Sequence, residues 1–584
     1  MQLRCRIRSL AIASLVCGLV LGFQCQAQGQ TVDYFSTPWI VAPLPPNTSS
    51  APQNGLANGG GGTASPGAYS TLYSHAMAQS APNAPPWSLT ANLGIDEIAT
   101  DNVEDTAQGR TADLGSLFSA GIVGTADSTR LSGIISATGV YRRDTSDAAL
   151  DGFSGYGYAN GRATIIPDTL YLSINGLMDD LSREGGGLQN ALAQMATTTK
   201  TYSVSASPYL YTQAGDFAVN VLRYQIGQVW FDDNTGAIQT PGVDIGPITP
   251  STDQNAREDF RMAGTLLPRL SSDVSLSRME NDSGALGSGD YTNLDGELIN
   301  EYEVTRYASA IFGAGYEQLR DNDFPQIDGE DPIWDIGTRL RPNPDSYVLL
   351  TYGRHNLKSD FAGELWWQLT DLSNVYAAYT DSISNSQQAV TGNDSVSQVG
   401  PDGAAAGVNF NQSTLIGTLD DPVLNAGPGE QAGGSPLGVP LTDINNALPL
   451  QNGLFRNKSF RSTARTTIDD NPLSLTIYYL QSTQLTPIGG VFNDQVGQTE
   501  TSAGGILSWS RPFTPDLSGL MSAGYNHSNQ GDAGIYNGTL GLTKILSQSL
   551  SIILRYDLIY RDAHPSTSGY VQNVITIGLH KTFN

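Results

Sequence analysis

The chain has 584 residues, and its 56 Asp and Glu residues outnumber its 30 Lys and Arg residues, giving a formal net charge of −26. This acidity argues against nucleic acid as a partner, because phosphate contacts need clustered basic side chains. The mean hydropathy of −0.21 is too polar for a bundle of membrane helices. The 26 Tyr, 16 Phe and 7 Trp residues are too many for a disordered acidic chain.

The first 27 residues have the pattern of a secretory signal peptide. Three arginines precede an apolar stretch at 10–23, and Ala27 stands at the candidate cleavage site. A basic start, a short apolar core and a small residue at the cut predict a cleaved export signal over residues 1–27. All the cysteines of the chain fall inside it: Cys5, Cys17 and Cys25. The expected mature chain therefore lacks disulfides and thiolate metal sites.

Residues 28–86 form a low-complexity segment rich in Pro and Gly, with a run of glycines at 59–62. Such a composition buries too little apolar surface to order itself. We therefore predict a disordered N-terminal periplasmic segment. At roughly 60 residues, it is too short for the folded plug domain of a siderophore-type transporter.

From Trp87 onward, short segments alternate apolar and polar residues, as at 170–179, 361–370, 473–479 and 549–561. A period of two places one set of side chains toward lipid and the other toward a lumen. Barrels that cross membranes carry this signature, which is weak in each segment and strong in repetition. The predicted fold is all-β, a transmembrane antiparallel up-and-down β-barrel over residues 87–584.

The connections between these segments alternate between short turns, rich in Pro, Asn and Asp, and long polar stretches. The long ones are predicted at 179–200, 231–258, 321–331 and 384–457. The segment count predicts about 22 strands, with about 18 as the lower bound. An even number places both ends of the barrel in the periplasm. The connection 384–457 is long enough to serve as a constriction or plug.

The last strand alternates apolar residues on one face with polar residues on the other. Its apolar face carries Ile575, Ile577, Leu579 and Phe583. An aromatic residue at the end of such a strand resembles the signal read by the outer-membrane barrel assembly machinery. We expect these four side chains to face lipid, and the strand to pair with the one that begins near Trp87. The alternative is an edge strand of a soluble β-sandwich.

Four stretches carry a family likeness, at 100–103 (TDNV), 334–354, 453–463 and 569–583. In these stretches and their order, the chain from Trp87 onward resembles the β-barrel porin 2 family, in the branch associated with exopolysaccharide and PEP-CTERM/exosortase loci. The resemblance implies an outer-membrane barrel encoded near polysaccharide synthesis and export genes. It implies no catalytic residue.

Constellations for catalysis are scarce in the sequence. The five histidines are scattered, without a second histidine at metal-ligand spacing: His75, His355, His527, His564 and His580. No phosphate-binding glycine loop, zinc-helix motif or nucleophile elbow is present. We predict that the protein is not an enzyme and that it uses no cofactor and no metal site. An outer-membrane lipase, with a serine and a histidine on neighbouring strands, is the enzymatic alternative.

Acidic residues crowd the predicted loop at 321–331, namely Asp321, Asp323, Asp328, Glu330 and Asp331. Loops of this composition are usually solvated. The alternative is a set of oxygen ligands for Ca²⁺ or Mg²⁺. The spacing matches no known calcium loop, so the solvated loop is the favoured interpretation.

Alternation also predicts which side chains face the lumen. The candidates are Tyr171, Glu364, Trp366, Tyr478, Arg555, Asp557 and Arg561. The three aromatic residues among them could stack on sugar rings, although packing or a place in an interface girdle is favoured for aromatics in general. Charges that project inward usually pair across a lumen and also tune what passes through it.

These patterns predict a non-enzymatic pore or conduit of the bacterial outer membrane that serves exopolysaccharide export. The alternatives are a general diffusion porin for small solutes and a structural surface barrel without transport. An acidic lumen would favour cations over anions. The expected partners are outer-membrane lipid and lipopolysaccharide, the barrel assembly machinery and polysaccharide export components.

Overall fold

The computed structural model describes twenty-four segments of the chain, and the first strand begins at Trp87. The described residues are 87–102, 110–128, 130–145, 151–167, 169–182, 198–214, 218–231, 250–262, 269–282, 290–321, 324, 327–343, 346–355, 357–370, 372–384, 397–399, 405–407, 453–468, 471–486, 496–514, 516–529, 533–547, 549–562 and 569–583. The predicted signal peptide (1–27), the predicted linker (28–86) and most of the predicted constriction (384–457) lie outside them.

The described elements are β-strands, and within these residues no helix is long and apolar enough to cross a membrane. The first strands are β1 (Trp87–Thr100), β2 (Asp113–Asp127), β3 (Leu131–Asp144), β4 (Gly152–Ile166), β5 (Leu170–Ser182), β6 (Thr198–Ala214), β7 (Ala218–Phe231), β8 (Ser251–Met262), β9 (Leu270–Asp282), β10 (Tyr291–Thr305), β11 (Ala308–Asp321) and β12 (Gly329–Asn343). They are followed by β13 (Ser346–His355), β14 (Lys358–Thr370), β15 (Ser373–Ser384), β16 (Ser397–Val399), β17 (Ala405–Gly407), β18 (Phe455–Ile468), β19 (Asn471–Gln484), β20 (Thr499–Thr514), β21 (Leu517–Ser528), β22 (Ala533–Ser547), β23 (Leu550–Arg561) and β24 (Tyr570–Phe583).

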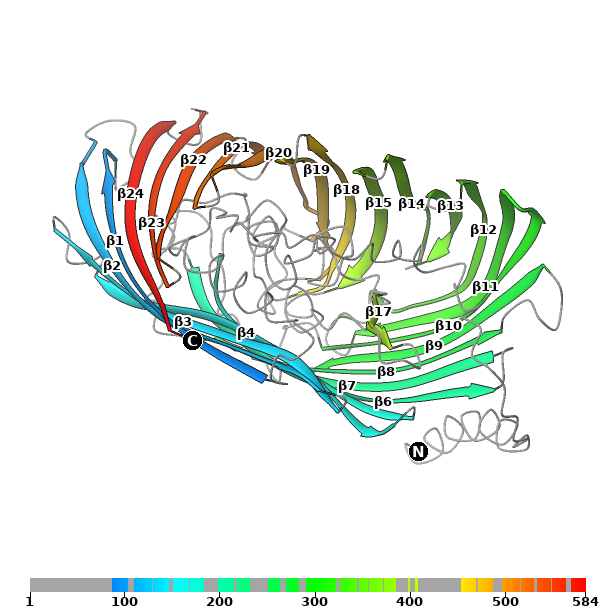
Figure 1. Ribbon diagram of the computed structural model, residues 1–584. Helices are drawn as coiled ribbons and strands as arrows, with labels where there is room; N and C mark the ends of the chain where they lie inside the picture. Colours follow the sequence, from blue (N-terminus) through cyan, green and yellow to red (C-terminus); the bar gives the residue numbers. More distant parts are fainter. Residues whose placement is uncertain are drawn as a thin grey trace.

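The strands form one closed antiparallel ring. Each strand pairs with the next along the chain, and β15 pairs with β18, so that β16 and β17 form a separate two-stranded sheet. The ring closes where β24 pairs with β1, from Ala91 opposite Phe583 to Thr100 opposite Val574. Figure 1 shows this seam, with the red β24 beside the blue β1. The 22-stranded sheet confirms the predicted all-β up-and-down barrel.

The two ends of the barrel differ in their connections. At the end where β1 begins, here called the turn end, most strands are joined by short turns, such as the one between Thr305 and Ala308. At the opposite end, the loop end, the connections are mostly longer, and the longest runs from Ser384 to Phe455. One loop-end connection is short, because β14 follows β13 after Leu357, whose φ of 63° lies in the left-handed region.

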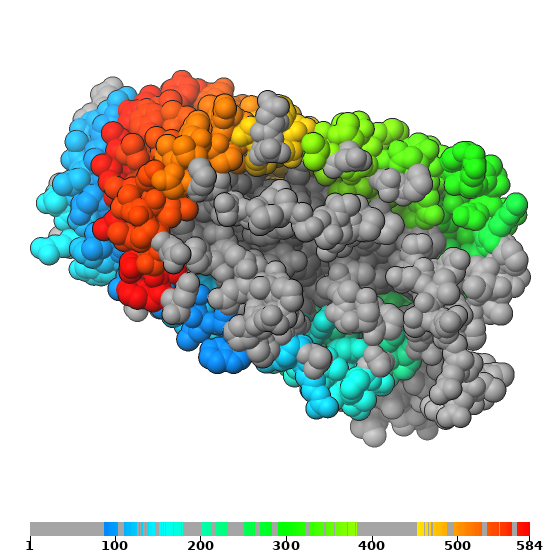
Figure 2. Space-filling view, viewed as in Figure 1, coloured from blue at the N-terminus to red at the C-terminus, as the bar shows by residue number. Residues whose placement is uncertain are grey.

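The outer face of the ring is apolar on most of its strands. On β1, Leu89, Leu93 and Ile95 are exposed, whereas Asn92 and Asp96 on the alternate positions are buried. The same alternation recurs around the ring, and Figure 2 shows neighbouring strands packed side by side along this wall. A soluble protein does not expose a continuous belt of large apolar side chains. The belt is therefore the surface that meets the hydrocarbon of a membrane.

Aromatic residues flank the aliphatic belt on the outer face. Towards the loop end they contact one another across strands, in the groups Trp334–Tyr352–Phe361 and Tyr525–Tyr536–Tyr560. Towards the turn end lie the exposed rings of Trp87, Tyr307, Phe513 and Phe583. Such rings sit at the headgroup level of a bilayer. The protein is therefore a transmembrane β-barrel of the outer-membrane type.

The predicted loop at 231–258 is wrong in part. The stretch 231–258 was expected to be a loop, but β8 begins at Ser251 and pairs with both β7 and β9. This strand lacks the alternation of apolar and polar residues on which the prediction relied, because neither of its faces is apolar. Gln254 and Glu258 lie on one face, and Asp253 and Asp259 lie on the other. Pairing with β7 and β9 holds β8 in the strand conformation, although its residues have a low intrinsic preference for strands.

Candidate functional site

The candidate functional site is the inner face of the ring. Successive residues of a strand point to opposite sides of the sheet, and the exposed apolar residues mark the outer side. On β10, for example, Leu294 and Leu298 are exposed on the outer face. The residues between them, Asp295 and Glu297, therefore point inward.

Strands β8 to β12 give the inner face an acidic region, here called the acidic wall. Its outer side carries the exposed side chains of Leu276, Leu298 and Phe312. Its inward carboxylates include Asp253, Asp259, Asp273, Asp295, Glu297, Glu301, Glu317, Asp321 and Asp335. The cationic side chains described on the same strand faces are fewer: Arg257, Arg339 and Arg341.

Several of these carboxylates have defined partners. Arg257 Nη2 lies 2.9 Å from Asp259 Oδ1, and Arg339 Nη1 lies 3.7 Å from Glu301 Oε2. Asp295 accepts a hydrogen bond from the Ser277 hydroxyl. The excess of carboxylates gives this side of the lumen a negative potential, which attracts cations.

Strands β19 to β22 give the inner face a neutral region, here called the hydroxyl wall. Its inward residues include Ser474, Thr476, Tyr478, Ser482, Ser502, Ser508, Ser522, Asn526, Asn537 and Thr539. Among the described inward residues of these strands, the one charged side chain is Glu500. Figure 1 shows β19 and β20 across the barrel from β8 and β9.

Neutral hydrogen bonds link the side chains of the hydroxyl wall. Tyr478 Oη and Ser502 Oγ both donate to Asn526 Oδ1, at 2.8 and 2.9 Å. The hydroxyls of Thr463, on the neighbouring β18, and Thr476 are 3.1 Å apart. Such groups both donate and accept, so these side chains satisfy one another without ionised partners, whereas Ser474 Oγ and Asn537 Oδ1 have no hydrogen-bond partner among the described residues.

Two of the three aromatic residues predicted to stack on sugar rings, Tyr171 and Tyr478, are buried among the side chains that line the barrel. Tyr171 is 4% exposed and stacks on Tyr209, with ring centroids 5.0 Å apart. Tyr478 is 7% exposed and hydrogen-bonded to Asn526. Rings buried in this way pack the wall and offer little free face to a sugar.

Trp366 and Glu364 lie on the inward face of β14, on the positions between the exposed Phe361 and Leu369. Trp366 is half-buried and meets Tyr376 edge to face, at 6.5 Å between centroids. Glu364 accepts a hydrogen bond of 2.6 Å from Tyr347 Oη. Trp366 is therefore the predicted aromatic with the most accessible ring.

The predicted inward charges of β23 form a local ion pair. Arg555 Nη2 lies 2.7 Å from Asp557 Oδ1, and Thr539 donates to the same oxygen at 2.7 Å. Arg561 lies further along the same strand face, at the loop end, opposite Ile535. These charges sit beside the hydroxyl wall and neutralise each other in part.

The last strand presents its apolar residues on the outer face. The exposed fractions are 46% for Ile575, 51% for Ile577, 46% for Leu579 and 47% for Phe583. On the opposite face of the strand, His580 is buried, and its Nε2 lies 2.9 Å from Asp96 Oδ1 across the seam.

The loop end of the seam joins two of the stretches that carry the family likeness. Asp101 accepts hydrogen bonds from the backbone amide and the side-chain amide of Asn573, each at 2.7 Å. Gln572 Nε2 donates to the Asn102 carbonyl at 2.7 Å. Residues 100–102 and 569–583 are therefore adjacent in space, where the two ends of the sheet meet and close the ring.

The acidic residues of the 321–331 region have protein partners. Asp321 accepts from the Phe324 amide and Asp328 from the Asp321 amide, each at 2.8 Å. At the start of β12, Glu330 pairs with Arg320 at 3.4 Å and Asp331 with Arg354 at 2.6 Å. Asp323 lies outside the described residues. The predicted solvated loop is therefore wrong in part, because Asp321 is buried at the end of β11 and Glu330 and Asp331 belong to β12.

Sequence reasoning missed one cluster of side chains, which the ring assembles on the acidic wall. His355 Nε2 lies 2.7 Å from Asp335 Oδ2 and 4.0 Å from Glu297 Oε1. The three residues come from β13, β12 and β10. Their sequence spacing carries no motif, because strand register alone brings them together.

No family model matches the chain, and no curated protein matches it. Similar solved structures include the FrpB iron transporter from Neisseria meningitidis (F5-1 variant), with 10% identity, a TM-score of 0.44 and coverage of 85% of this chain and 82% of that chain. The outer membrane protein OpdK from Pseudomonas aeruginosa has 8% identity, a TM-score of 0.31 and coverage of 85% and 99%. The siderophore receptor PirA from Pseudomonas aeruginosa has 9% identity, a TM-score of 0.35 and coverage of 85% and 80%.

Proposed function

We propose that the protein is a non-enzymatic outer-membrane pore for hydrophilic solutes. The observation that carries the proposal is the closed ring of 22 strands with a polar inner face. Barrels of about 16 to 18 strands already enclose an aqueous channel, so this ring has room for one. In this proposal residues 1–27 export the chain, and the turn end of the barrel faces the periplasm.

Within this pore, we propose an exopolysaccharide as the exported solute. The hydroxyl wall offers donors and acceptors that match sugar hydroxyls. The half-buried Trp366 offers an aromatic surface for a sugar ring. The acidic wall repels polyanions, so the polymer should be neutral or cationic. The resemblance to the β-barrel porin 2 family points to the same substrate class.

The second candidate is a general diffusion porin with a preference for small cations. The acidic wall favours it, because fixed carboxylates along one side of a lumen select for cations without any specific binding site. A structural barrel without transport is the third candidate.

Single-channel recording of the full mature chain in planar lipid bilayers separates these functions. A large, weakly selective open pore supports the diffusion porin. A pore that stays closed until polysaccharide export components are added supports export. A deletion strain with normal polysaccharide release and normal permeability would overturn both and leave the structural barrel.

Matched triple variants test whether the acidic wall sets the selectivity. We expect Asp273→Asn with Asp295→Asn and Glu301→Gln to reduce the cation preference, because three inward carboxylates are neutralised. The control combines Ser502→Ala, Ser508→Ala and Ser522→Ala on the hydroxyl wall. It should leave the reversal potential unchanged in a KCl gradient, and an equal shift in both triples would refute the assignment.

A further inference from the structure

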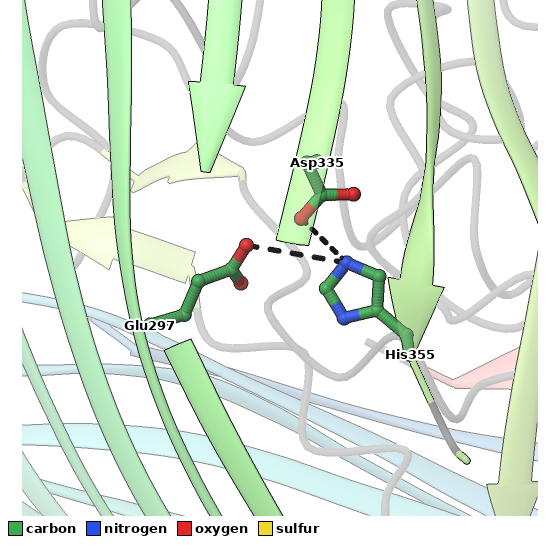
Figure 3. A group of neighbouring side chains, drawn as sticks. All are labelled: Glu297, Asp335 and His355. Carbon is green, nitrogen blue, oxygen red and sulfur yellow. Dashed lines mark hydrogen bonds and ion pairs between the residues drawn. The ribbon is translucent and has the colours of Figure 1, made fainter. Parts of the chain in front are cut away.

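We propose that Glu297, Asp335 and His355 bind one divalent transition-metal ion, such as Zn²⁺, in the acidic wall. The three side chains come from three strands and point toward a common centre (Figure 3). One ligand atom from each lies within 4.8 Å of the others. This site lies beyond the proposed transport function and does not depend on it.

The two separations measured from His355 Nε2 fit a shared ion. His355 Nε2 is 2.7 Å from Asp335 Oδ2 and 4.0 Å from Glu297 Oε1. With metal–ligand bonds of about 2.0 to 2.2 Å, two ligands of one ion are at most about 4.4 Å apart. The donor set is one imidazole and two carboxylates, which suits Zn²⁺ or Fe²⁺ better than Ca²⁺ or Mg²⁺.

Glycines make the approach of the two carboxylates possible. Strand β11 lies between β10 and β12, and it places Gly315 opposite Glu297 and Gly313 opposite Asp335. A Cβ atom at Gly313 would lie 3.0 Å from both Glu297 Oε1 and Asp335 Oδ2. On the far side of Asp335, a Cβ atom at Gly353 would overlap its carboxylate. Glycine inside a strand weakens it, and it often marks a close approach of other groups.

Both carboxylates of the site are largely buried, and one of them has an oxygen atom that its protein partners leave unsatisfied. The side chains of Glu297 and Asp335 are 12% and 9% exposed. Glu297 Oε1 has no hydrogen-bond partner among the described residues. Two buried carboxylates side by side repel each other, and a divalent cation between them removes that cost. The His355 side chain is 34% exposed, which leaves room for water ligands on the lumen side.

A protonated histidine could hold the same geometry without a metal, by donating to Asp335 while lying near Glu297. The metal site and the ion pair make different predictions for the stoichiometry of metal binding. The metal site binds one ion per barrel with an affinity that depends on all three side chains. The ion pair alone shows no saturable binding that His355 controls.

The test is calorimetric titration of Zn²⁺ into the full mature chain, refolded in detergent and freed of metal with a chelator. We expect one Zn²⁺ per barrel, and His355→Gln, Asp335→Asn and Glu297→Gln should each lower its affinity about tenfold or more. His527→Gln, on β21, is the matched control and should bind as the native chain does. Absent binding, or binding unchanged in His355→Gln, would overturn the site.

A second readout keeps the test decisive if a variant folds poorly. Co²⁺ added to the native barrel should produce visible absorption bands that Zn²⁺ displaces, because both ions accept imidazole and carboxylate ligands. Heat-modifiable migration on gels verifies that each variant is a folded barrel. A folded His355→Gln barrel with the native Co²⁺ spectrum would contradict the proposal.

Discussion

The acidic wall and the hydroxyl wall are built on the same strand geometry and differ in how they satisfy polar side chains. Both place exposed apolar residues such as Leu298 and Leu475 outside and polar residues inside. On the acidic wall, carboxylates depend on a few cationic partners such as Arg257 and Arg339. On the hydroxyl wall, groups such as Thr476 and Asn526 meet neutral neighbours. The alternation that places apolar residues toward lipid therefore does not determine the charge of the inward residues. The charge of the lumen can differ from one side of the barrel to the other.

This difference has an energetic consequence. Removing one partner of a buried ion pair leaves an uncompensated charge, at a cost of about 3 to 5 kcal/mol. Removing one neutral hydrogen bond costs about 1 kcal/mol. The acidic wall should therefore be the more fragile of the two when single side chains are removed, and the variants below test this.

The largest expected effect is the loss of a buried cation from the acidic wall. Arg339 and Glu301 are 5% and 3% exposed, and their charged atoms are 3.7 Å apart. We expect Arg339→Met to lower the free energy of unfolding by about 3 kcal/mol, because Glu301 keeps its charge without its partner. Urea titration of the refolded barrel, followed by tryptophan fluorescence, measures the change.

A double variant controls for lost packing at the same position. Arg339→Met combined with Glu301→Leu removes both charges and should recover much of the lost stability. A single variant within about 0.5 kcal/mol of the native chain would show that the pair carries no such cost.

A smaller effect is expected on the hydroxyl wall. Thr476→Val removes the hydroxyl that lies 3.1 Å from that of Thr463 and should cost about 1 kcal/mol in the same titration. Thr476→Ser keeps the hydroxyl and serves as the control. If Thr476→Val cost as much as Arg339→Met, the contrast between the walls would be wrong.

The smallest effect is expected outside both walls, in the turn before β21. Hydrogen bonds from Lys544 and Thr514 hold the pKa of Asp516 below its usual range. Because the pKa is lower in the folded state, the contribution of Asp516 is present above its ordinary pKa of about 4 and fades as the pH falls through the lowered value. The carboxylate is exposed, so salt screens the contribution.

Asp516→Asn tests this pH dependence against the native chain. The difference in unfolding midpoint should be small at pH 7 and smaller still at pH 3. A difference of equal size at both pH values would show that the charge of Asp516 contributes nothing.

The barrel itself could be predicted from the sequence, since alternation and turn chemistry act within each strand. Ile575, Ile577 and Leu579 alternate with polar residues in the sequence, and a period of two needs no tertiary knowledge to be recognised. The start of strand β8 was not predicted, because Gln254 and Glu258 make its outer face as polar as its inner face. Its neighbours, rather than its own pattern, decide its structure.

The cluster of Glu297, Asp335 and His355 could not be predicted in the same way. In the sequence, each of these residues occupies an ordinary polar position of an alternating strand. Their proximity depends on the register of β10 to β13 and on Gly313 and Gly315 of the strand between the two carboxylates. Register across several strands is a property of the closed ring and leaves no trace in sequence spacing.

The most direct test of the contrast between the walls compares one serine on each. Ser275 lies between Asp259 and Glu297 on the acidic wall. Ser522 lies between Ser508 and Thr539 on the hydroxyl wall, and both serines are half-buried. Because the expected mature chain has no cysteine, Ser275→Cys and Ser522→Cys each introduce a single thiol for a cationic or an anionic methanethiosulfonate reagent.

The measurement is the ratio of the cationic to the anionic reaction rate at each position in the reconstituted barrel. A negative potential along the acidic wall predicts that this ratio is about tenfold higher for Ser275→Cys than for Ser522→Cys, and that the difference shrinks at high salt. Equal ratios, or a higher ratio for Ser522→Cys, would contradict the charge asymmetry of the lumen.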